Sequence, residues 1–261
     1  MSTLAERLRS TLAAHPLAAI VVAGLVVRIA LMPLWAHLPN GTTDEGFWTH
    51  WMEFIHRDGV LNVFRTTDTD YVGYHWVLWA LSLVYEGMGG SYESKGLPLH
   101  LLVKVPSIIF DVVLMLTAYW ATATLVRHSG KTATPALRRA PLIAAAVVAF
   151  QPAVLYDGAV WAQTDSAITA AMLGSVVLAA QRRPFASGAV LALGLAVKPH
   201  PIMIAPVLAI MLWRSGGARA LLRASAGALV VAVVVLGPWI LHGEAYRIAE
   251  VYQTLFTKHR E

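Results

Sequence analysis

Long apolar stretches separated by short polar joints occupy most of the chain. The first, residues 17–38, is broken only by Arg28, and its 22 residues exceed the ~20 that a helix needs to cross the hydrocarbon core of a bilayer. Charged residues make up only 13% of the chain, roughly half the share found in soluble domains. The sequence therefore predicts an all-α, polytopic transmembrane helical bundle of about seven spans. The seven stretches are residues 17–38, 99–126, 140–156, 165–181, 185–197, 199–213 and 224–242.

Basic residues gather in the N-terminal segment and at three of the joints between these stretches. They are Arg7 and Arg9, then Arg127, Lys131, Arg138 and Arg139, then Arg182 and Arg183, and finally Arg214, Arg219 and Arg223. Lysine and arginine accumulate on the cytoplasmic side of membrane proteins, so residues 1–16 and these joints are predicted to be cytoplasmic. The formal net charge of +5 is thus interpreted as an orientation signal, and no nucleic-acid partner is expected.

A long polar segment, residues 39–98, follows the first stretch and is acidic. Between residues 40 and 98 there are eight acids and three bases, with aromatic residues interleaved, a pattern typical of short amphipathic helices at a membrane interface. The apolar run at residues 71–85 is interpreted as a helix that lies along or dips into the outer leaflet. If it crossed the membrane, the acidic loop and the basic joints would lie on the same side. The prediction is a core of residues 17–242, whose first extracytoplasmic loop is residues 39–98, and an extracytoplasmic tail of residues 243–261.

Two features inside the predicted core carry further expectations. Arg28 and Asp111 lie midway along the first two stretches, and a charge in hydrocarbon costs on the order of 2.5 to 3.5 kcal/mol, so we expect them to form an interhelical ion pair. The two stretches within residues 185–213 can be either a re-entrant hairpin or two tilted crossings. The charge pattern does not distinguish these alternatives, since either arrangement begins and ends in the cytoplasm. The prolines near residues 198–201 favour a broken segment with its tip there.

Polar residues that can do chemistry are predicted to converge on the outer face. A carboxylate can take a proton from a hydroxyl nucleophile, and a lysine or histidinium can neutralise a leaving phosphate. Two plainer interpretations stay open, namely that the acids of the loop are only solvated and that Asp165 caps the following helix. The residues are Asp44, Glu45, Asp68, Asp70, Tyr71, His75, Asp157, Gln163, Asp165, Lys198 and His200.

No cofactor is expected. The chain has no cysteine, and its ten histidines lie mostly at the ends of stretches or in loops, without the HExxH spacing. A divalent cation held by Asp44 and Asp157 is a minor alternative.

Several runs of sequence resemble a known superfamily. They are Asp44-Glu45, the run from Asp68 to Tyr74, Lys104-Val105-Pro106-Ser107, the run from Phe150 to Ser166, and Ala196-Val197-Lys198-Pro199-His200-Pro201. Together they resemble the GT-C superfamily of polyprenyl-phosphate-sugar glycosyltransferases, in particular bacterial mannosyltransferase-like members related to the GPI-anchor mannosyltransferases. The chain departs from the usual pattern at Ala162-Gln163, where relatives usually carry Gly-Gln.

The resemblance implies a multi-pass protein of the cytoplasmic membrane with its active site on the extracytoplasmic side. It implies an inverting transfer of a sugar, with mannose expected, from a polyprenyl-phosphate donor to a lipid-linked or glycan acceptor. Asp44 matches the catalytic base, with Glu45 as its neighbour and reserve, while Lys198 and His200 are expected to bind the phosphate. The expected substrate-binding set is completed by Asp70, Tyr71, His75, Asp157, Gln163 and Asp165. The last three would orient the sugar or the acceptor, or align Asp44 through hydrogen bonds.

The resemblance also leaves alternatives. Family members usually continue past the seventh span, so this chain is expected to be an N-terminal seven-span core whose further helices come from a continuation or from a partner. A non-catalytic remnant, or a subunit of a split glycosyltransferase, is one alternative function. A lipid or solute transporter that uses Arg28, Lys104, Asp111 and Asp165 as a polar pathway is another.

Overall fold

The computed structural model describes residues 14–34, 43–65, 71–93, 95–130 and 134–257, and within these ranges the chain is helical without any strand. The helices are α2 (Pro16–Leu31), α3 (Thr43–Asp58), η1 (Val60–Arg65), η2 (Val72–Tyr74), α4 (His75–Gly87), α5 (Leu97–His128), α6 (Pro135–Phe150), α7 (Pro152–Leu155), η3 (Tyr156–Val160), α8 (Asp165–Ala180), α9 (Pro184–Val197), η4 (His200–Ile204), α10 (Ala205–Leu241) and α11 (Ala245–Thr257). The all-α prediction is confirmed for the described residues.

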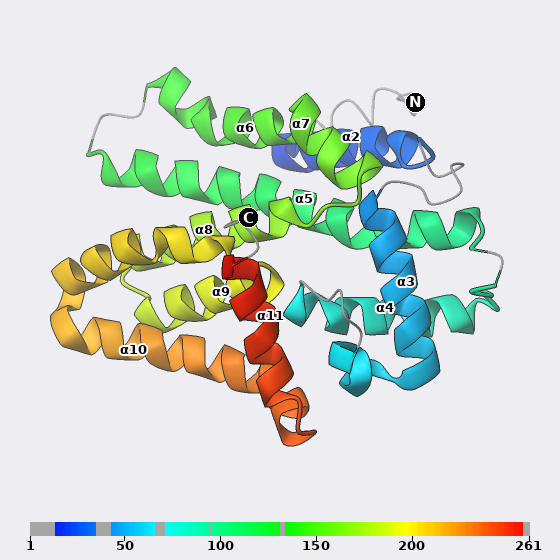
Figure 1. The fold of residues 1–261 in the computed structure, drawn as a ribbon. Coiled ribbons are helices and arrows are strands. Elements are labelled where there is room, and N and C mark those ends of the chain that lie inside the picture. Colours follow the sequence, from blue (N-terminus) through cyan, green and yellow to red (C-terminus); the bar gives the residue numbers. More distant parts are fainter. Residues whose placement is uncertain (1–13, 35–42, 66–70, 94, 131–133, 258–261) are drawn as a thin grey trace, which may run out of the picture.

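Helix α5 runs through the middle of the molecule. Figure 1 shows α2 and α6 on one side of it and α8, α9 and α10 on the other, and α5 packs directly against α2, α6 and α8. Helices α3 and α4 lie together at the end of the bundle where α5 begins. The arrangement leaves α5 in contact with both halves of the bundle, so its polar side chains can reach either half.

Proline chemistry decides where several helices begin and where one of them breaks. Helices α6, α7 and α9 each have a proline at their first position, where the missing N–H costs no hydrogen bond. The residue before a proline avoids the helical region, and Gln151 is accordingly extended, with ψ 119°. The chain bends by 50° at this break between α6 and α7, within the predicted stretch 140–156.

A glycine pair divides α10 into two arms. Gly216 and Gly217 have non-helical backbone angles, and Gly217 has φ 58° and ψ −150°, a region that only glycine occupies readily. In Figure 1 the first, yellow arm of α10 turns back at this point and the second, orange arm returns beside it. The turn coincides with the basic joint predicted between residues 213 and 224.

Length and apolar character identify two candidate membrane spans, Leu97–His128 and His200–Leu241, and a third if the bent pair Pro135–Phe150 and Pro152–Val160 counts as one. Three more apolar helices, α2, α8 and α9, are only 14 to 16 residues long. The count of seven spans and the placement of residues 39–98 as an outer loop stay predictions.

Aromatic side chains join α3 and α4 to the end of α10. Trp48, Trp51 and Trp239 are almost completely buried in one apolar cluster. The indole of Trp239 donates to the carbonyl oxygen of Val60 at 2.9 Å, which satisfies its buried N–H. The described part of the acidic segment is therefore a packed subdomain rather than a solvated loop.

The ion pair expected between Arg28 and Asp111 is confirmed. Arg28 Nε lies 2.6 Å from Asp111 Oδ2, and both side chains are completely buried. Arg28 also donates to the carbonyl oxygen of Ala149 at 2.8 Å, and Ser166 Oγ donates to Asp111 Oδ1. A side chain at Gly158 would collide with the carboxylate of Asp111, so these groups tie α2, α5, η3 and α8 together at one point.

Candidate functional site

Asp44 lies in the first turn of α3, where a carboxylate is favoured by the helix dipole. Its side chain is largely buried, and its Oδ2 accepts hydrogen bonds from both Trp161 Nε1 and Gln163 Nε2. Both donors thus meet one oxygen. The hydrogen bonds found among the described residues leave Oδ1 as the oxygen able to accept a proton from a substrate.

Lys198 lies on the other side of the Gln163 side chain. Lys198 Nζ donates to Gln163 Oε1 at 2.8 Å and to Asp165 Oδ1, and it lies 5.0 Å from the centre of the Tyr71 ring, within cation–π distance. Gln163 therefore bridges the carboxylate of Asp44 and the ammonium of Lys198. We call Asp44, Tyr71, Trp161, Gln163, Asp165 and Lys198 the polar cluster.

The segment between η3 and α8 holds Trp161 and Gln163 in place. Gln163 N donates to the carbonyl oxygen of Asp157 at 2.9 Å, and the indole of Trp48 in α3 donates to the carbonyl oxygen of Ala162 at 2.9 Å. Ala162 has φ 66°, in the left-handed region that favours glycine. A residue with a side chain thus occupies a backbone conformation that glycine would adopt at lower cost.

Lys198 directly follows the last residue of α9, and this position orients its side chain. Its own backbone is extended, with φ −142° and ψ 152°, as expected for a residue that precedes a proline. The Lys198 side chain is only slightly exposed, whereas the side chain of its partner Asp165 is 51% exposed. Asp165 can therefore leave Lys198 for water more easily than Gln163 can.

Burial and neighbouring charges set the protonation of the cluster. Burial raises the pKa of Asp44 above its ordinary value, although the hydrogen bond from Trp161 and the charge of Lys198 oppose this. Burial disfavours the charge on Lys198, but Tyr71 and Asp165 outweigh it, so the pKa of Lys198 is raised. The cluster thus holds a carboxylate of increased basicity beside a permanent cation at neutral pH.

Glu45, the neighbour of Asp44, lies in a second charged group beneath the cluster. It is completely buried, with Lys104 Nζ 2.8 Å from its Oε1 and His100 Nδ1 3.0 Å from its Oε2. Lys104 also donates to the carbonyl oxygens of Met32 and Leu34, at 2.8 and 3.0 Å. This group ties the end of α2 and the start of α3 to α5.

His75 is also completely buried, and it supports the backbone of the cluster. Its Nδ1 lies 2.8 Å from the carbonyl oxygen of Tyr71 and 3.2 Å from that of Val72. Burial lowers the pKa of His75 to about 4, so the imidazole is neutral at physiological pH and Nδ1 carries the proton that those carbonyls accept. The ring packs beside Trp51, with 5.0 Å between the two ring centres, and is not open to a substrate.

The remaining predicted residues lie around the cluster. Asp157, in η3, is half-buried and within electrostatic reach of Asp44, Asp165 and Lys198. His200 is exposed at the start of η4, two residues after Lys198. Asp68 and Asp70 lie outside the described residues. In the ranges that the structure covers, no group of three or more His, Asp or Glu side chains could hold a metal ion.

Two kinds of residue at the site were not predicted. Trp161 was part of the run that carries the resemblance, but its indole donor was not assigned a role. Lys104 and His100 were not connected with Glu45, because their partner is known only once the direction of α3 is known.

Residues 96–259, more than half of the chain, match the family model of glycosyltransferase family 87. This region includes Trp161, Gln163, Asp165 and Lys198, whereas Asp44 and Tyr71 precede it. No curated protein and no solved structure matches the chain.

Proposed function

The chain belongs to glycosyltransferase family 87 and is therefore a membrane glycosyltransferase, and on that basis we propose its reaction and the residues that carry it. The enzyme transfers a sugar, with mannose the first candidate, from a polyprenyl-phosphate donor to a lipid-linked or glycan acceptor, without a cofactor. The observation that supports this most is the buried carboxylate of Asp44, one amide side chain away from the cation of Lys198.

Asp44 is the general base of a single displacement in this proposal. The acceptor hydroxyl oxygen forms a bond to the anomeric carbon while the bond from that carbon to the phosphate oxygen breaks, and Asp44 Oδ1 takes the hydroxyl proton. The polyprenyl phosphate leaves with the bonding electrons. A single displacement inverts the anomeric centre. Because phosphate is already a good leaving group, one base and one cation are enough, unlike the two carboxyl groups of a glycosidase.

Lys198 stabilises the negative charge that develops on the leaving phosphate. To do so it exchanges the half-exposed Asp165 for a phosphate oxygen and keeps Gln163 as its second partner. His200, exposed nearby, is the second phosphate contact. Asp165 released in this way, together with Asp157, Tyr71 and Asp70, is available to the hydroxyl groups of the sugar or of the acceptor.

Glu45 and His75 act as positioning residues in this proposal. Glu45 fixes the first turn of α3, and with it Asp44, through Lys104 and His100. His75 fixes the carbonyl groups of Tyr71 and Val72, which sets the Tyr71 ring against Lys198.

We also propose that the chain crosses the cytoplasmic membrane seven times, with the polar cluster on the extracytoplasmic side. The crossings are α2, α5, the α6–α7–η3 unit, α8, α9 and the two arms of α10. The basic residues at the turn of α10 and between α8 and α9 support this orientation, because these joints are expected in the cytoplasm.

The test is a transfer assay with the full chain in vesicles of bacterial phospholipid, given radiolabelled polyprenyl-phosphate mannose and a mannose-terminated glycolipid acceptor. The expected product is a glycolipid in which the new bond has the opposite anomeric configuration to the donor, as NMR reports. Retention of configuration, or no transfer from this and other polyprenyl-phosphate hexoses, would contradict the proposal. The Lys198→Met variant is expected to lose transfer, while the exposed Arg183→Met variant keeps it.

A further inference from the structure

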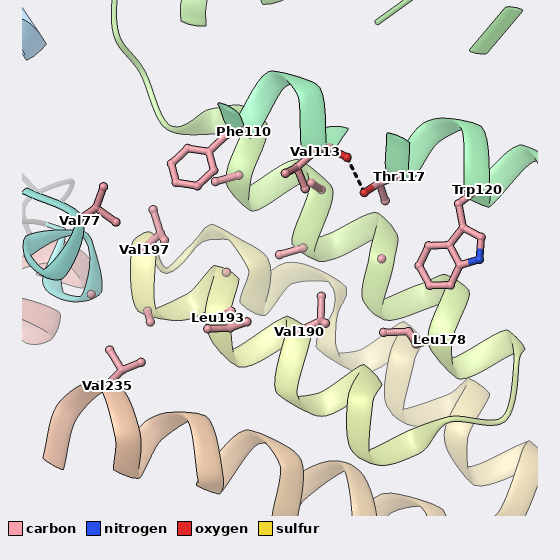
Figure 2. A pocket seen from close by; sticks show the side chains of 17 residues that line it. Val77, Phe110, Val113, Thr117, Trp120, Leu178, Val190, Leu193, Val197 and Val235 are labelled. Atoms are coloured by element: carbon pink, nitrogen blue, oxygen red, sulfur yellow. Dashed lines mark hydrogen bonds between the residues drawn. The ribbon is translucent and has the colours of Figure 1, made fainter. Parts of the chain in front are cut away.

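An apolar groove begins beside the polar cluster and descends between the helices. Its volume is about 490 Å³, which falls within the range of small-molecule sites. Figure 2 shows α8 behind it, with side chains of α5 on one side and of α9 on the other. Its lining is apolar except for the indole N–H of Trp120 and the hydroxyl of Thr117, which donates to the carbonyl oxygen of Val113 at 2.7 Å.

Small residues of α8 form the floor of the groove. Ala167, Ala170, Ala171 and Gly174 recur at helical spacing along one face. A β-carbon at Gly174 would make only ordinary contacts, 3.5 Å from Val190, so space remains above this face. The floor is therefore open enough for a narrow, elongated occupant.

The groove runs parallel to the helices and is about as deep as one leaflet. Its floor extends from Ala167 to Leu178, which corresponds to about 16 Å at 1.5 Å per residue. This is close to half of the ~30 Å hydrocarbon core. In Figure 2, Val77, Val197 and Val235 lie at one end, and Trp120 and Leu178 lie at the other.

The end of the groove at Val197 adjoins the polar cluster. Three lining residues are close in sequence to cluster residues: Val197 precedes Lys198, Ala167 follows Asp165 by two positions, and Gly73 follows Tyr71 by two. This end of the groove therefore lies beside the chain segments that carry Lys198, Asp165 and Tyr71. Its other end lies at Trp120 and Leu178, among mostly apolar side chains.

We propose that this groove binds the isoprenoid chain of the donor lipid, with the phosphate at Lys198 and the first part of the chain lying over α8. This inference rests on the proposed function, because that function supplies a donor with an anionic head and a long hydrocarbon tail. The depth of one leaflet fits a chain whose head stays at the membrane surface. The cation of Lys198 beside this end of the groove fits a phosphate head, and the apolar lining fits an isoprenoid chain.

The test uses the full chain in detergent and farnesyl monophosphate as the ligand. Leucine in place of Ala170 puts three more carbons into the groove. We therefore expect Ala170→Leu to raise the Kd for farnesyl monophosphate at least about tenfold. The matched control is Ala226→Leu on the exposed side of α10, which is expected to bind as the wild type does. Isopentenyl monophosphate has the same phosphate head but only one isoprene unit. Its binding is expected to be equal in the wild type, Ala170→Leu and Ala226→Leu.

Unchanged binding of farnesyl monophosphate by a folded Ala170→Leu variant would overturn the proposal. So would equal competition by dioleoyl phosphatidic acid, because that would make the groove a site for bulk lipid. If Ala170→Leu does not fold, farnesyl monophosphate with a diazirine at the chain end is used on the wild type. Labels at Trp120, Leu178 or Val190 support the groove, and labels confined to other helices contradict it.

The outcomes for the groove and for the proposed function can be told apart. Binding of farnesyl monophosphate in the groove without any sugar transfer would reject the function and keep the site. Transfer that persists at the wild-type rate and donor KM in Ala170→Leu would keep the function and reject the site.

Discussion

Asp44 and Glu45 are adjacent carboxylates whose surroundings differ completely. Asp44 accepts hydrogen bonds from neutral N–H donors, one of which, Gln163, also contacts Lys198, whereas Glu45 is enclosed by Lys104 and His100. A base must be within reach of the proton that it takes, and only Asp44 meets this requirement. The sequence places the two acids side by side but cannot separate their roles, because that depends on which face of α3 meets α5.

The first prediction concerns the pH dependence of transfer. The pKa of Asp44 is raised by burial and lowered by the hydrogen bond from Trp161. Base catalysis needs the ionised carboxylate, so the rate falls as the pH drops through this pKa. Removing the indole N–H in Trp161→Phe raises the pKa of Asp44, and the acid limb of kcat/KM moves to higher pH. Trp213→Phe, at an exposed position, should leave the limb unchanged; an unmoved limb in Trp161→Phe would count against Asp44 as the titrating base.

The second prediction separates positioning from catalysis. Glu45→Gln keeps the shape of the side chain, so we expect transfer to fall about tenfold, well short of the 100-fold or greater loss expected for a missing base. The pH profile should keep its wild-type midpoint, because Asp44 still titrates. A loss as large as that of Asp44→Asn, measured in the same vesicle assay, would instead make Glu45 the base.

Helices are the scale at which sequence and structure agree best, and prolines and glycines explain the differences. The stretch 99–126 becomes α5 almost unchanged, whereas the stretch 140–156 breaks at Pro152, because Gln151 must be extended. The pairing of Arg28 with Asp111 was predictable, since two charges at the same depth in apolar helices need partners. The contacts of Lys104 with the end of α2 could not be predicted, because every residue has a carbonyl group and the sequence does not indicate which of them accepts a hydrogen bond.

The third prediction tests the Arg28–Asp111 pair that joins α2 to α5. Replacing one partner leaves the other charge buried and unpaired, so Arg28→Met or Asp111→Leu should each lower the free energy of unfolding by about 3–5 kcal/mol. The double variant should recover much of that loss. Unfolding in mixed micelles measures the three values, and strictly additive losses would show that the two side chains are not coupled.

The fourth prediction concerns the turn of α10. Gly217 has a backbone conformation that side chains rarely adopt, so Gly217→Ala should destabilise the protein by about 1–3 kcal/mol. Gly237→Ala, in the second arm with open space around its α-carbon, should stabilise it by about 0.5–1 kcal/mol. If both variants shift the unfolding midpoint in the same direction, α10 does not turn at Gly217.

Charged groups buried inside the bundle are paired, whereas Asp165 in the polar cluster is half exposed. Of the four residues predicted for a transport pathway, Arg28, Lys104 and Asp111 have buried partners, and Asp165 is half exposed and paired with Lys198. Asp165 pairs with Lys198, and both lie close in sequence to residues that line one end of the apolar groove. This distribution fits a reaction at the membrane surface better than passage through the bundle.

The fifth prediction concerns orientation. Because the chain has no cysteine, a single introduced thiol reports one position. An impermeant maleimide should label Met88→Cys, 70% exposed at the end of α4, in intact cells, and Arg183→Cys, between α8 and α9, only after the membrane is opened. The reverse pattern would place the polar cluster in the cytoplasm and reject the proposed side of the reaction.

The account depends above all on Asp44 as the base, and one pair of variants tests this most directly. Asp44→Asn keeps an oxygen that can accept from Trp161 and Gln163 but cannot take a proton, while Asp58→Asn makes the same change at the exposed end of the same helix. The predicted result is a loss of sugar transfer of about 100-fold or more in Asp44→Asn, with unaltered unfolding and with full transfer in Asp58→Asn. Equal rates in the two variants would contradict the account.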